Sequence, residues 1–289
     1  MGKVYDALKR AEEQRGRWVH EAAARSAPSE LEPSPPLPAG SPRPEPPLAR
    51  SLAFLAGLGR VQPAAVKETA GTLNKRRIVL LQPDSFVAEQ FRTLRARLDS
   101  LAANRPIRTI GVTSALPGDG KTLASIGLAV VNAMQPGRRV LLVDCDLRKP
   151  SVASSLGLRV DAGLAEVLTE TASLEDALVR VEGHELEVLP VRAVPQNPSE
   201  LLASDGMRKL LETLAGRYDR VILDLPPTLG LPDAKTVSEL CDGVIFVVRA
   251  DVTPEPEIAS ALDVLDRRRV LGLVMNGSEP LSSRYESMR

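Results

Sequence analysis

Six short aliphatic runs alternate with helix-like segments between Thr109 and Asn276. The runs are TIGVTS (109–114), VLLVDCD (140–146), LEVLPV (186–191), VILDL (221–225), GVIFVVR (243–249) and VLGLVMN (270–276). Helical composition marks the intervening segments LASIGLAVVNAM, SELLASDGMRKLLETLAG and EIASALDVLDRR. Strands of continuous Val, Ile and Leu separated by helices are typical of parallel strands buried on both faces. The pattern predicts an α/β fold whose mostly parallel, doubly wound sheet carries helices on both faces.

Composition divides the chain into four parts. Residues 1–25 predict an amphipathic helix, because apolar residues recur there at roughly helical spacing. Residues 26–83 predict a disordered linker followed by a poorly defined segment, since nine prolines lie between Pro28 and Pro47; a plain spacer and a Pro-rich ligand are both open. Residues 84–276 are expected to form the α/β domain, and residues 277–289 a flexible tail with one tyrosine, Tyr285. The domain is expected to open with a helix whose apolar stripe is Val87, Phe91, Leu94, Leu98 and Leu101.

Charge and hydropathy narrow the class of partners. Lys plus Arg and Asp plus Glu both number 37, so no large basic field is available and we expect no nucleic-acid partner. Cys145 and Cys241 lie in apolar runs, which favours buried thiols in a reducing compartment. No apolar run reaches the length that spans a bilayer. We therefore expect a cytoplasmic protein that a partner would have to recruit to the inner face of the membrane.

The segment SALPGDGKT (114–122) carries the clearest chemical signal. Ala115 to Thr122 fits the P-loop pattern and stands between an expected strand and an expected helix, as that motif requires. Gly118 and Gly120 allow backbone N–H groups to turn toward phosphate oxygens at the start of a helix. Lys121 would reach the β and γ phosphates of ATP, and the Thr122 hydroxyl would bind Mg²⁺. The expected nucleotide-binding residues are Pro117, Gly118, Asp119, Gly120, Lys121, Thr122 and Leu123.

Three aspartates end two of the expected strands. Asp144 and Asp146 are two residues apart and share a strand face, whereas Cys145 points away from them. Asp224 ends VILDL and has the form of a Walker B aspartate. A lone strand-end aspartate is commonly a helix N-cap or a turn residue. Three beside a P-loop instead favour a metal site, because ligands of doubly wound sheets bind at the carboxyl ends of the strands.

The motifs SALPGDGKT, VLLVDCDLRKP and YDRVILDLPP, in this order and spacing, resemble the catalytic domain of the bacterial tyrosine kinases (BY-kinases) of capsule and exopolysaccharide synthesis. The segments EQFRTLRARL, GLAEVL, NPSELL and LGLVMN, together with Asp233 and Ala234, match the same family. The opening YDALKRAEE resembles members without a fused membrane module. The related ParA/MinD ATPases carry a signature lysine where this chain has Leu116, which favours the kinase branch.

The resemblance implies roles for individual residues. It implies ATP and Mg²⁺ as cofactors, with Lys121, Asp144, Asp146 and Asp224 as the catalytic group and with Thr122 and the three aspartates around the metal. Asp144 is the expected recipient of the tyrosine proton. Asn276 matches a position that contacts adenine, although a strand-ending Asn is also a common turn former. Glu89, Arg92 and Arg95 match an element that packs between subunits of a ring, and the alternative is an exposed intrahelical ion-pair row.

The tail departs from the resemblance. Family members usually end in a tyrosine cluster, whereas Tyr285 stands alone here, with Tyr5 a distant second acceptor and Tyr218 expected to be structural. Three functions remain open. The first is a tyrosine autokinase that phosphorylates its tail in trans and regulates polysaccharide synthesis or export, with a membrane-embedded chain-length or export protein as activator. The others are an ATPase switch that controls assembly, as in ParA and MinD, and a scaffold for which the nucleotide is only a structural ligand.

Overall fold

The computed structural model describes residues 84–103 and 105–278. The predicted amino-terminal helix, the Pro-rich segment and the tail tyrosine Tyr285 lie outside these residues. The strands are β1 (Thr109–Ser114), β2 (Val140–Asp144), β3 (Val179–Arg180), β4 (Leu186–Leu189), β5 (Arg220–Asp224), β6 (Gly243–Arg249) and β7 (Val270–Asn276). The helices are α4 (Phe86–Ala102), α5 (Lys121–Ala133), α6 (Val152–Leu156), α7 (Leu164–Leu168), α8 (Leu174–Ala177), α9 (Pro198–Leu202), α10 (Asp205–Arg217), α11 (Asp233–Ser238) and α12 (Glu255–Val264).

The strands form one seven-stranded sheet in the order β3-β4-β2-β5-β1-β6-β7. All neighbouring pairs run parallel except β3 and β4. The predicted α/β fold is therefore confirmed. Strand β3, which the sequence analysis did not predict, has only two residues and adds an antiparallel edge. Because β5 lies between β2 and β1, the carboxyl ends of these three strands are neighbours.

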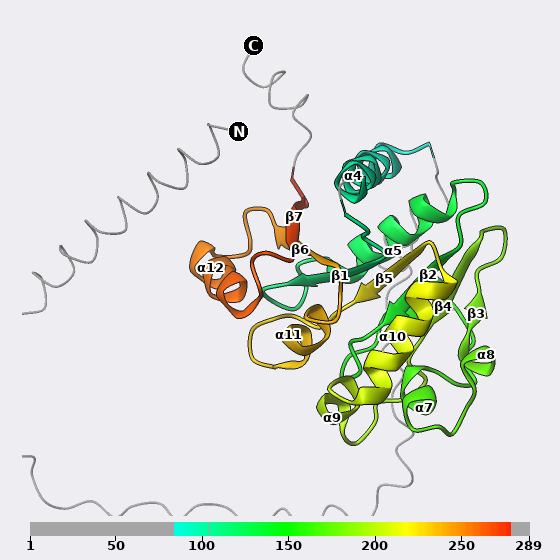
Figure 1. Cartoon of the computed structure of the whole chain (residues 1–289). Helices are drawn as coiled ribbons and strands as arrows, with labels where there is room; N and C mark the ends of the chain where they lie inside the picture. Colours follow the sequence, from blue (N-terminus) through cyan, green and yellow to red (C-terminus); the bar gives the residue numbers. More distant parts are fainter. Residues whose placement is uncertain (1–83, 104, 279–289) are drawn as a thin grey trace, which may run out of the picture. The chain divides into compact units, whose positions relative to one another are not determined.

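Helices cover both faces of the sheet (Figure 1). On one face α5 packs against the sheet and α4 packs on α5, and their aliphatic side chains join those of Ile110, Val112 and Ile222 in one core cluster. On the other face, residues of α7, α9 and α10 enclose Leu141, Val143 and Leu223 in a second cluster. Alternate residues of one strand therefore face different cores, which is why the strands are apolar throughout.

Two expected helices differ from the prediction in detail. The segment SELLASDGMRKLLETLAG is not one helix, because Ser204 separates α9 from α10 and its side chain accepts a hydrogen bond from the Met207 N–H. A serine in this position satisfies an otherwise unpaired helical N–H and starts a new helix. In α4, Leu98 is buried as expected, but Leu101 at the end of the apolar stripe is exposed.

A buried arginine connects α4 to the sheet. Arg220 at the start of β5 is 2% exposed and donates to Asp99 of α4 at 2.8 Å, and Arg138 also binds Asp99 at 2.9 Å. Within the described residues, Nε and Nη1 of Arg220 have no hydrogen-bond partner. Burial, followed by the nearby charge of Arg138, lowers the pKa of Arg220. Asp99 is therefore the carboxylate on which this buried positive charge depends.

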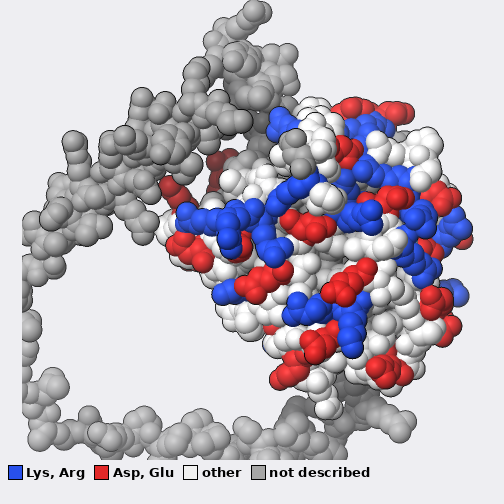
Figure 2. Space-filling view, in the orientation of Figure 1, with Lys and Arg blue, Asp and Glu red and all other residues white. Residues whose placement is uncertain are grey.

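Charges of both signs share the surface. Figure 2 shows Lys and Arg side chains beside Asp and Glu over much of the visible face. Exposed ion pairs such as Arg217 with Glu175, at 3.0 Å, contribute to this arrangement. Among the helices of residues 84–278, none combines the length and apolar character needed to cross a bilayer.

We expect Asp99→Asn to lower the free energy of unfolding by about 2 kcal/mol, because it leaves the buried Arg220 without its charged partner. Asp263→Asn is the matched control, since Asp263 of α12 forms an exposed ion pair with Arg267, which follows that helix. We expect the control to change stability by less than about 0.5 kcal/mol. Urea unfolding of the full chain measures both values, and equal losses would show that the Asp99 cluster is no more important than a surface pair.

Candidate active site

The phosphate loop joins β1 to α5 and has the backbone of an anion cradle. Gly118 and Gly120 have φ angles of 92° and 104°, a region that residues with a Cβ rarely adopt. Gly120 immediately precedes α5, and no side chain of the described residues caps that helix. The first N–H groups of α5 therefore remain available for an anion, which the helix dipole also favours.

Lys121 and Thr122, the last two residues of the loop motif, contact two of the three predicted aspartates. Lys121 Nζ lies 3.1 Å from Asp146 Oδ2. Thr122 Oγ1 donates to Asp224 Oδ2 at 2.7 Å. Ser125, one turn further along α5, donates to the other oxygen of Asp224 at 3.0 Å. The structure thus brings the loop, the end of β2 and the end of β5 into one site.

Asp144 lies beside Asp224, because the two residues are register partners in the parallel pair β2–β5. Its carboxylate accepts three backbone N–H bonds, from Asp146 at 3.2 Å and from Ser151 and Val152 at 3.0 Å each. Complete burial, followed by the charge of Asp224, raises its pKa to about 8, although the three N–H donors oppose the shift. Asp144 is therefore both a fixed anchor for the turn after β2 and a group that titrates near neutral pH.

Burial and the neighbouring charges also shift the pKa values of Asp224 and Lys121. Burial raises the pKa of Asp224, and Lys121 and the Thr122 hydroxyl oppose that rise. Burial alone would lower the pKa of Lys121, but the carboxylates of Asp224 and Asp146 outweigh it, so this pKa is raised. Lys121 is therefore held as a cation by the aspartates around it.

Asp119 and Asn276 connect the loop to the ends of β6 and β7. The buried Asp119 carboxylate accepts from the Leu116 N–H at 3.0 Å and from Thr253 Oγ1 at 2.8 Å, while its backbone oxygen accepts from Asn276 Nδ2 at 2.8 Å. A Cβ on Gly120 would lie only 2.0 Å from Asn276 Nδ2, so this glycine is also needed for close packing. Asn276 therefore lies beside the loop and its amide binds the loop backbone, while its contact with adenine stays a prediction.

The residues present fit a nucleotide with Mg²⁺. The left-handed glycines, the uncapped start of α5 and Lys121 suit phosphate oxygens. Thr122 and Asp224 supply the hydroxyl and carboxylate oxygens that Mg²⁺ prefers. In the described part of the chain no three Asp, Glu, His or Cys side chains form a metal cluster on their own. This arrangement matches the usual binding of Mg²⁺ through few protein ligands together with phosphates and waters.

The other predicted functional residues lie elsewhere. Glu89 and Arg92 pair with each other on α4, whereas Arg95 donates to the backbone oxygen of Val131 in α5. Tyr218 is buried and donates its hydroxyl to Glu187. Burial and this carboxylate raise the pKa of Tyr218, which makes its oxygen a poor nucleophile. The structural interpretation of Tyr218 is confirmed.

The sequence analysis missed two hydroxyls of the site. Ser125 binds Asp224, and Ser151 lies 3.0 Å from Thr122, measured between the two hydroxyl oxygens. Ser125 follows Lys121 by four residues, so helical spacing from the P-loop lysine was a usable signal. Ser151 had no such signal, because its position depends on the turn after β2.

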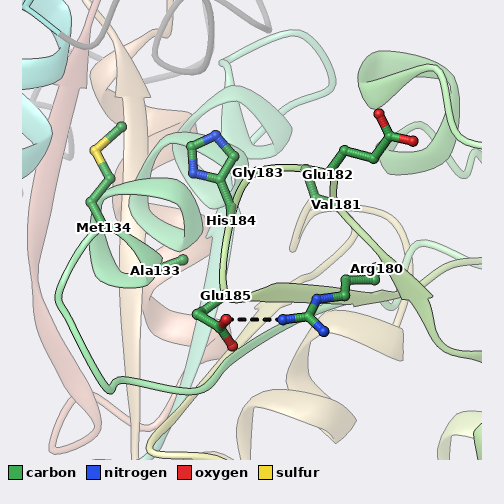
Figure 3. A pocket seen from close by; sticks show the side chains of 8 residues that line it. All are labelled: Ala133, Met134, Arg180, Val181, Glu182, Gly183, His184 and Glu185. Carbon is green, nitrogen blue, oxygen red and sulfur yellow. Dashed lines mark hydrogen bonds and ion pairs between the residues drawn. The ribbon is translucent and has the colours of Figure 1, made fainter.

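A separate cavity of about 650 Å³ lies at the other end of α5. Figure 3 shows it between Ala133 and Met134, at the carboxyl end of α5, and the β3–β4 hairpin, with Arg180 and Glu185 paired at 2.9 Å. A helix of this length places the cavity about 20 Å from the phosphate loop. It is therefore not part of the candidate active site.

We expect Asp144 of the nucleotide-free and Mg²⁺-free chain to contribute a stabilisation that is lost as pH rises from about 4 to about 8. The pKa of Asp144 is raised from 3.8 in the unfolded reference to about 8 in the folded chain, so the folded chain holds this proton more tightly. That stabilisation is complete below the pKa that Asp144 has in the unfolded chain. It is lost gradually as pH rises from that value to the pKa of Asp144 in the folded chain. One proton changes the free energy of unfolding by at most about 1.4 kcal/mol per pH unit.

Asp144→Asn tests the assignment of this slope, because an amide does not titrate. The variant should show a shallower pH dependence between pH 4 and 8, whatever its stability at a single pH. Asp161→Asn is the control, since Asp161 is exposed. A slope that Asp144→Asn leaves unchanged would assign the pH dependence to other groups. Urea unfolding at a series of pH values provides the measurement.

Comparison with known proteins is consistent with this geometry. The family described as AAA domain matches residues 107–253. Tyrosine-protein kinase YwqD of Bacillus subtilis is 35% identical over 218 residues, which cover 74% of this chain and 92% of YwqD. Several other curated relatives are longer, among them a succinoglycan biosynthesis transport protein of Rhizobium meliloti (32% identical over 74% of this chain), and the chain spans 27–29% of the length of these longer relatives.

Solved structures agree with the sequence relatives. The chimeric protein CapA2B2 superposes with a TM-score of 0.67 at 31% identity, covering 71% of this chain and 91% of that protein. The septum site-determining protein MinD of Pyrococcus horikoshii, solved with Mg-ADP, reaches a TM-score of 0.50 at 26% identity, with coverage of 62% and 76%. With a phosphate loop and Asp144, Asp146 and Asp224 in one site, and with YwqD matched over nearly its whole length, this chain belongs to the bacterial tyrosine-protein kinase family.

Proposed function

We propose that the chain is an ATP-dependent protein-tyrosine kinase that phosphorylates Tyr285 of its own tail in trans and regulates polysaccharide synthesis or export. The observation that carries the proposal is the convergence of Lys121, Thr122 and Asp224 with Asp144 and Asp146 at one edge of the sheet. The similarity to YwqD supports the reaction, and the succinoglycan transport relative supports the polysaccharide context.

The proposed roles follow from the contacts. The N–H groups at the start of α5 and the Lys121 ammonium would bind the phosphates of ATP. Thr122 and Asp224 would bind Mg²⁺ directly, and Asp144 and Asp146 would complete its surroundings. Bound Mg²⁺ would neutralise negative charge on the transferred phosphoryl group. Pro117 and Asp119 of the loop and Leu123 of α5 would hold the cradle in shape, and Asn276 would lie beside the base.

Asp144 is our choice for the group that receives or orients the tyrosine proton. A phenol has a pKa of about 10, and phosphoryl transfer through a loose transition state needs mainly alignment and late removal of this proton. With a pKa of about 8, Asp144 is mostly protonated at neutral pH, so it becomes a competent proton acceptor above about pH 8, or at lower pH where a bound cation favours its ionised form. Its three N–H donors fix its orientation before any substrate binds.

The wider setting is also part of the proposal. The resemblance to BY-kinases supports recruitment to the inner face of the membrane by a chain-length or export protein. Residues 84–276 would form the kinase domain, the amino-terminal helix and Pro-rich segment would lie before it, and the tail would supply the acceptor. Glu89 and Arg92 are exposed enough on α4 to join a contact between subunits of a ring.

Lys121→Met and Tyr285→Phe test the kinase directly. With γ-labelled ATP and Mg²⁺, we expect label on Tyr285 of the wild type, a loss of about 100-fold or more in Lys121→Met and no label in Tyr285→Phe. Lys209→Met is the matched control, because Lys209 is exposed on α10 and should leave transfer unchanged. Mass spectrometry should find Tyr218 unmodified.

The same assay decides between the kinase and an ATPase switch, which the structural similarity to MinD favours as the second candidate. The assay is run with and without a membrane fraction that contains a candidate activator. Release of phosphate with no labelled tyrosine in either condition would reject the kinase. Labelling that persists in Lys121→Met would reject the assignment of the site.

A further inference from the structure

Three motif residues to which the mechanism assigns no role meet beside the candidate active site. They are Arg148 of DLRKP, Ser199 of NPSELL and Asp233 at the start of α11. Arg148 Nε donates to Asp233 Oδ2 at 2.9 Å, and Arg148 Nη2 donates to Ser199 Oγ, also at 2.9 Å. Ser199 Oγ in turn donates to the second oxygen of Asp233 at 2.5 Å. We refer to these three residues as the Arg148 network.

The Arg148 network provides one hydrogen-bond donor for each oxygen of the buried Asp233 carboxylate. The Asp233 side chain is 1% exposed, whereas the Arg148 side chain is 38% exposed and reaches it from the surface. A buried carboxylate needs charged or hydrogen-bonding partners, and each oxygen of Asp233 has one. The contacts therefore fix the position of Arg148 relative to α9 and α11.

Arg148 is part of the turn that carries Asp146. The Lys149 N–H, next in the chain, donates to Asp146 Oδ1 at 3.0 Å, and the other oxygen of Asp146 binds Lys121 at 3.1 Å. The Asp146 carboxylate is thus shared between its own turn and the P-loop lysine. A displacement of the turn would move Asp146, and Lys121 would lose its ion-pair partner.

We propose that Arg148, Ser199 and Asp233 are positioning residues that hold the turn after β2 and so place the Lys121 ammonium for the terminal phosphate of a nucleotide. The inference rests on the proposed function in that it assigns Lys121 to the β and γ phosphates. Arginine suits this task better than lysine, because its planar fork serves Asp233 and Ser199 at once, whereas an ammonium on a flexible stem does not hold both in one geometry.

The test measures binding without turnover, as the ratio of the affinity for a non-hydrolysable ATP analogue to the affinity for ADP. The variants are Arg148→Gln, Arg148→Lys, and Arg148→Gln combined with Asp233→Asn. Arg192→Gln is the matched control. Arg192 makes a similar ion pair with Glu166, at 2.8 Å, and Glu166 contacts none of the site residues described above. The full chain is used throughout, and the thermal unfolding midpoint is recorded for each variant.

We expect both single Arg148 variants to lower the affinity ratio about tenfold, which corresponds to about 1.4 kcal/mol, and Arg192→Gln to leave it unchanged. The double variant removes the unpaired buried charge, so it should recover thermal stability without recovering the ratio. An unchanged ratio in folded Arg148 variants would overturn the proposal, and so would a ratio that recovers together with stability. A wild type that binds nucleotide with this selectivity but never labels Tyr285 would reject the kinase and leave this inference standing.

Discussion

The rest of the site depends on the pairing of Asp224 with the first two turns of α5. Thr122 and Ser125 bind the two oxygens of this buried carboxylate, so the start of α5 is fixed to the end of β5. Because β5 lies between β1 and β2, the same attachment places the phosphate loop beside Asp144 and Asp146. A hydrogen bond to a charged group in a low-dielectric interior is strong, and its loss would leave the carboxylate unsatisfied. The order of the strands and the hydrogen bonds of Asp224 therefore together position the chemical groups of the site.

Burying three aspartates close together costs electrostatic free energy. Three aspartates surround one lysine, and burial raises the pKa of both Asp144 and Asp224. A protein tolerates such crowding where a ligand supplies the missing positive charge, as strained and perturbed groups concentrate at functional sites. A divalent cation would relieve the repulsion. The cost in stability and the proposed affinity for Mg²⁺ then have the same physical origin.

The sequence predicted most of the fold and most of the site, because both follow from local signals. The aliphatic runs predicted the parallel strands, and the spacing of Gly118, Gly120 and Lys121 predicted the loop. The signals failed where tertiary context decides: Ser204 divides a segment that reads as one helix, and β3 is too short to show a pattern. The Arg148 network joins residues far apart in the chain, so the quoted motifs contained its members but not their contacts.

We propose that Asp224 and Thr122 together bind Mg²⁺ for a nucleotide held by the phosphate loop. Calorimetry of ADP binding with and without Mg²⁺, in the wild type and in Asp224→Asn, examines this pairing. We expect Mg²⁺ to raise the affinity of the wild type for ADP by about tenfold or more, and this gain to disappear in the variant while Mg²⁺-free binding persists. A Mg²⁺ gain of equal size in both proteins would show that Asp224 does not bind the ion.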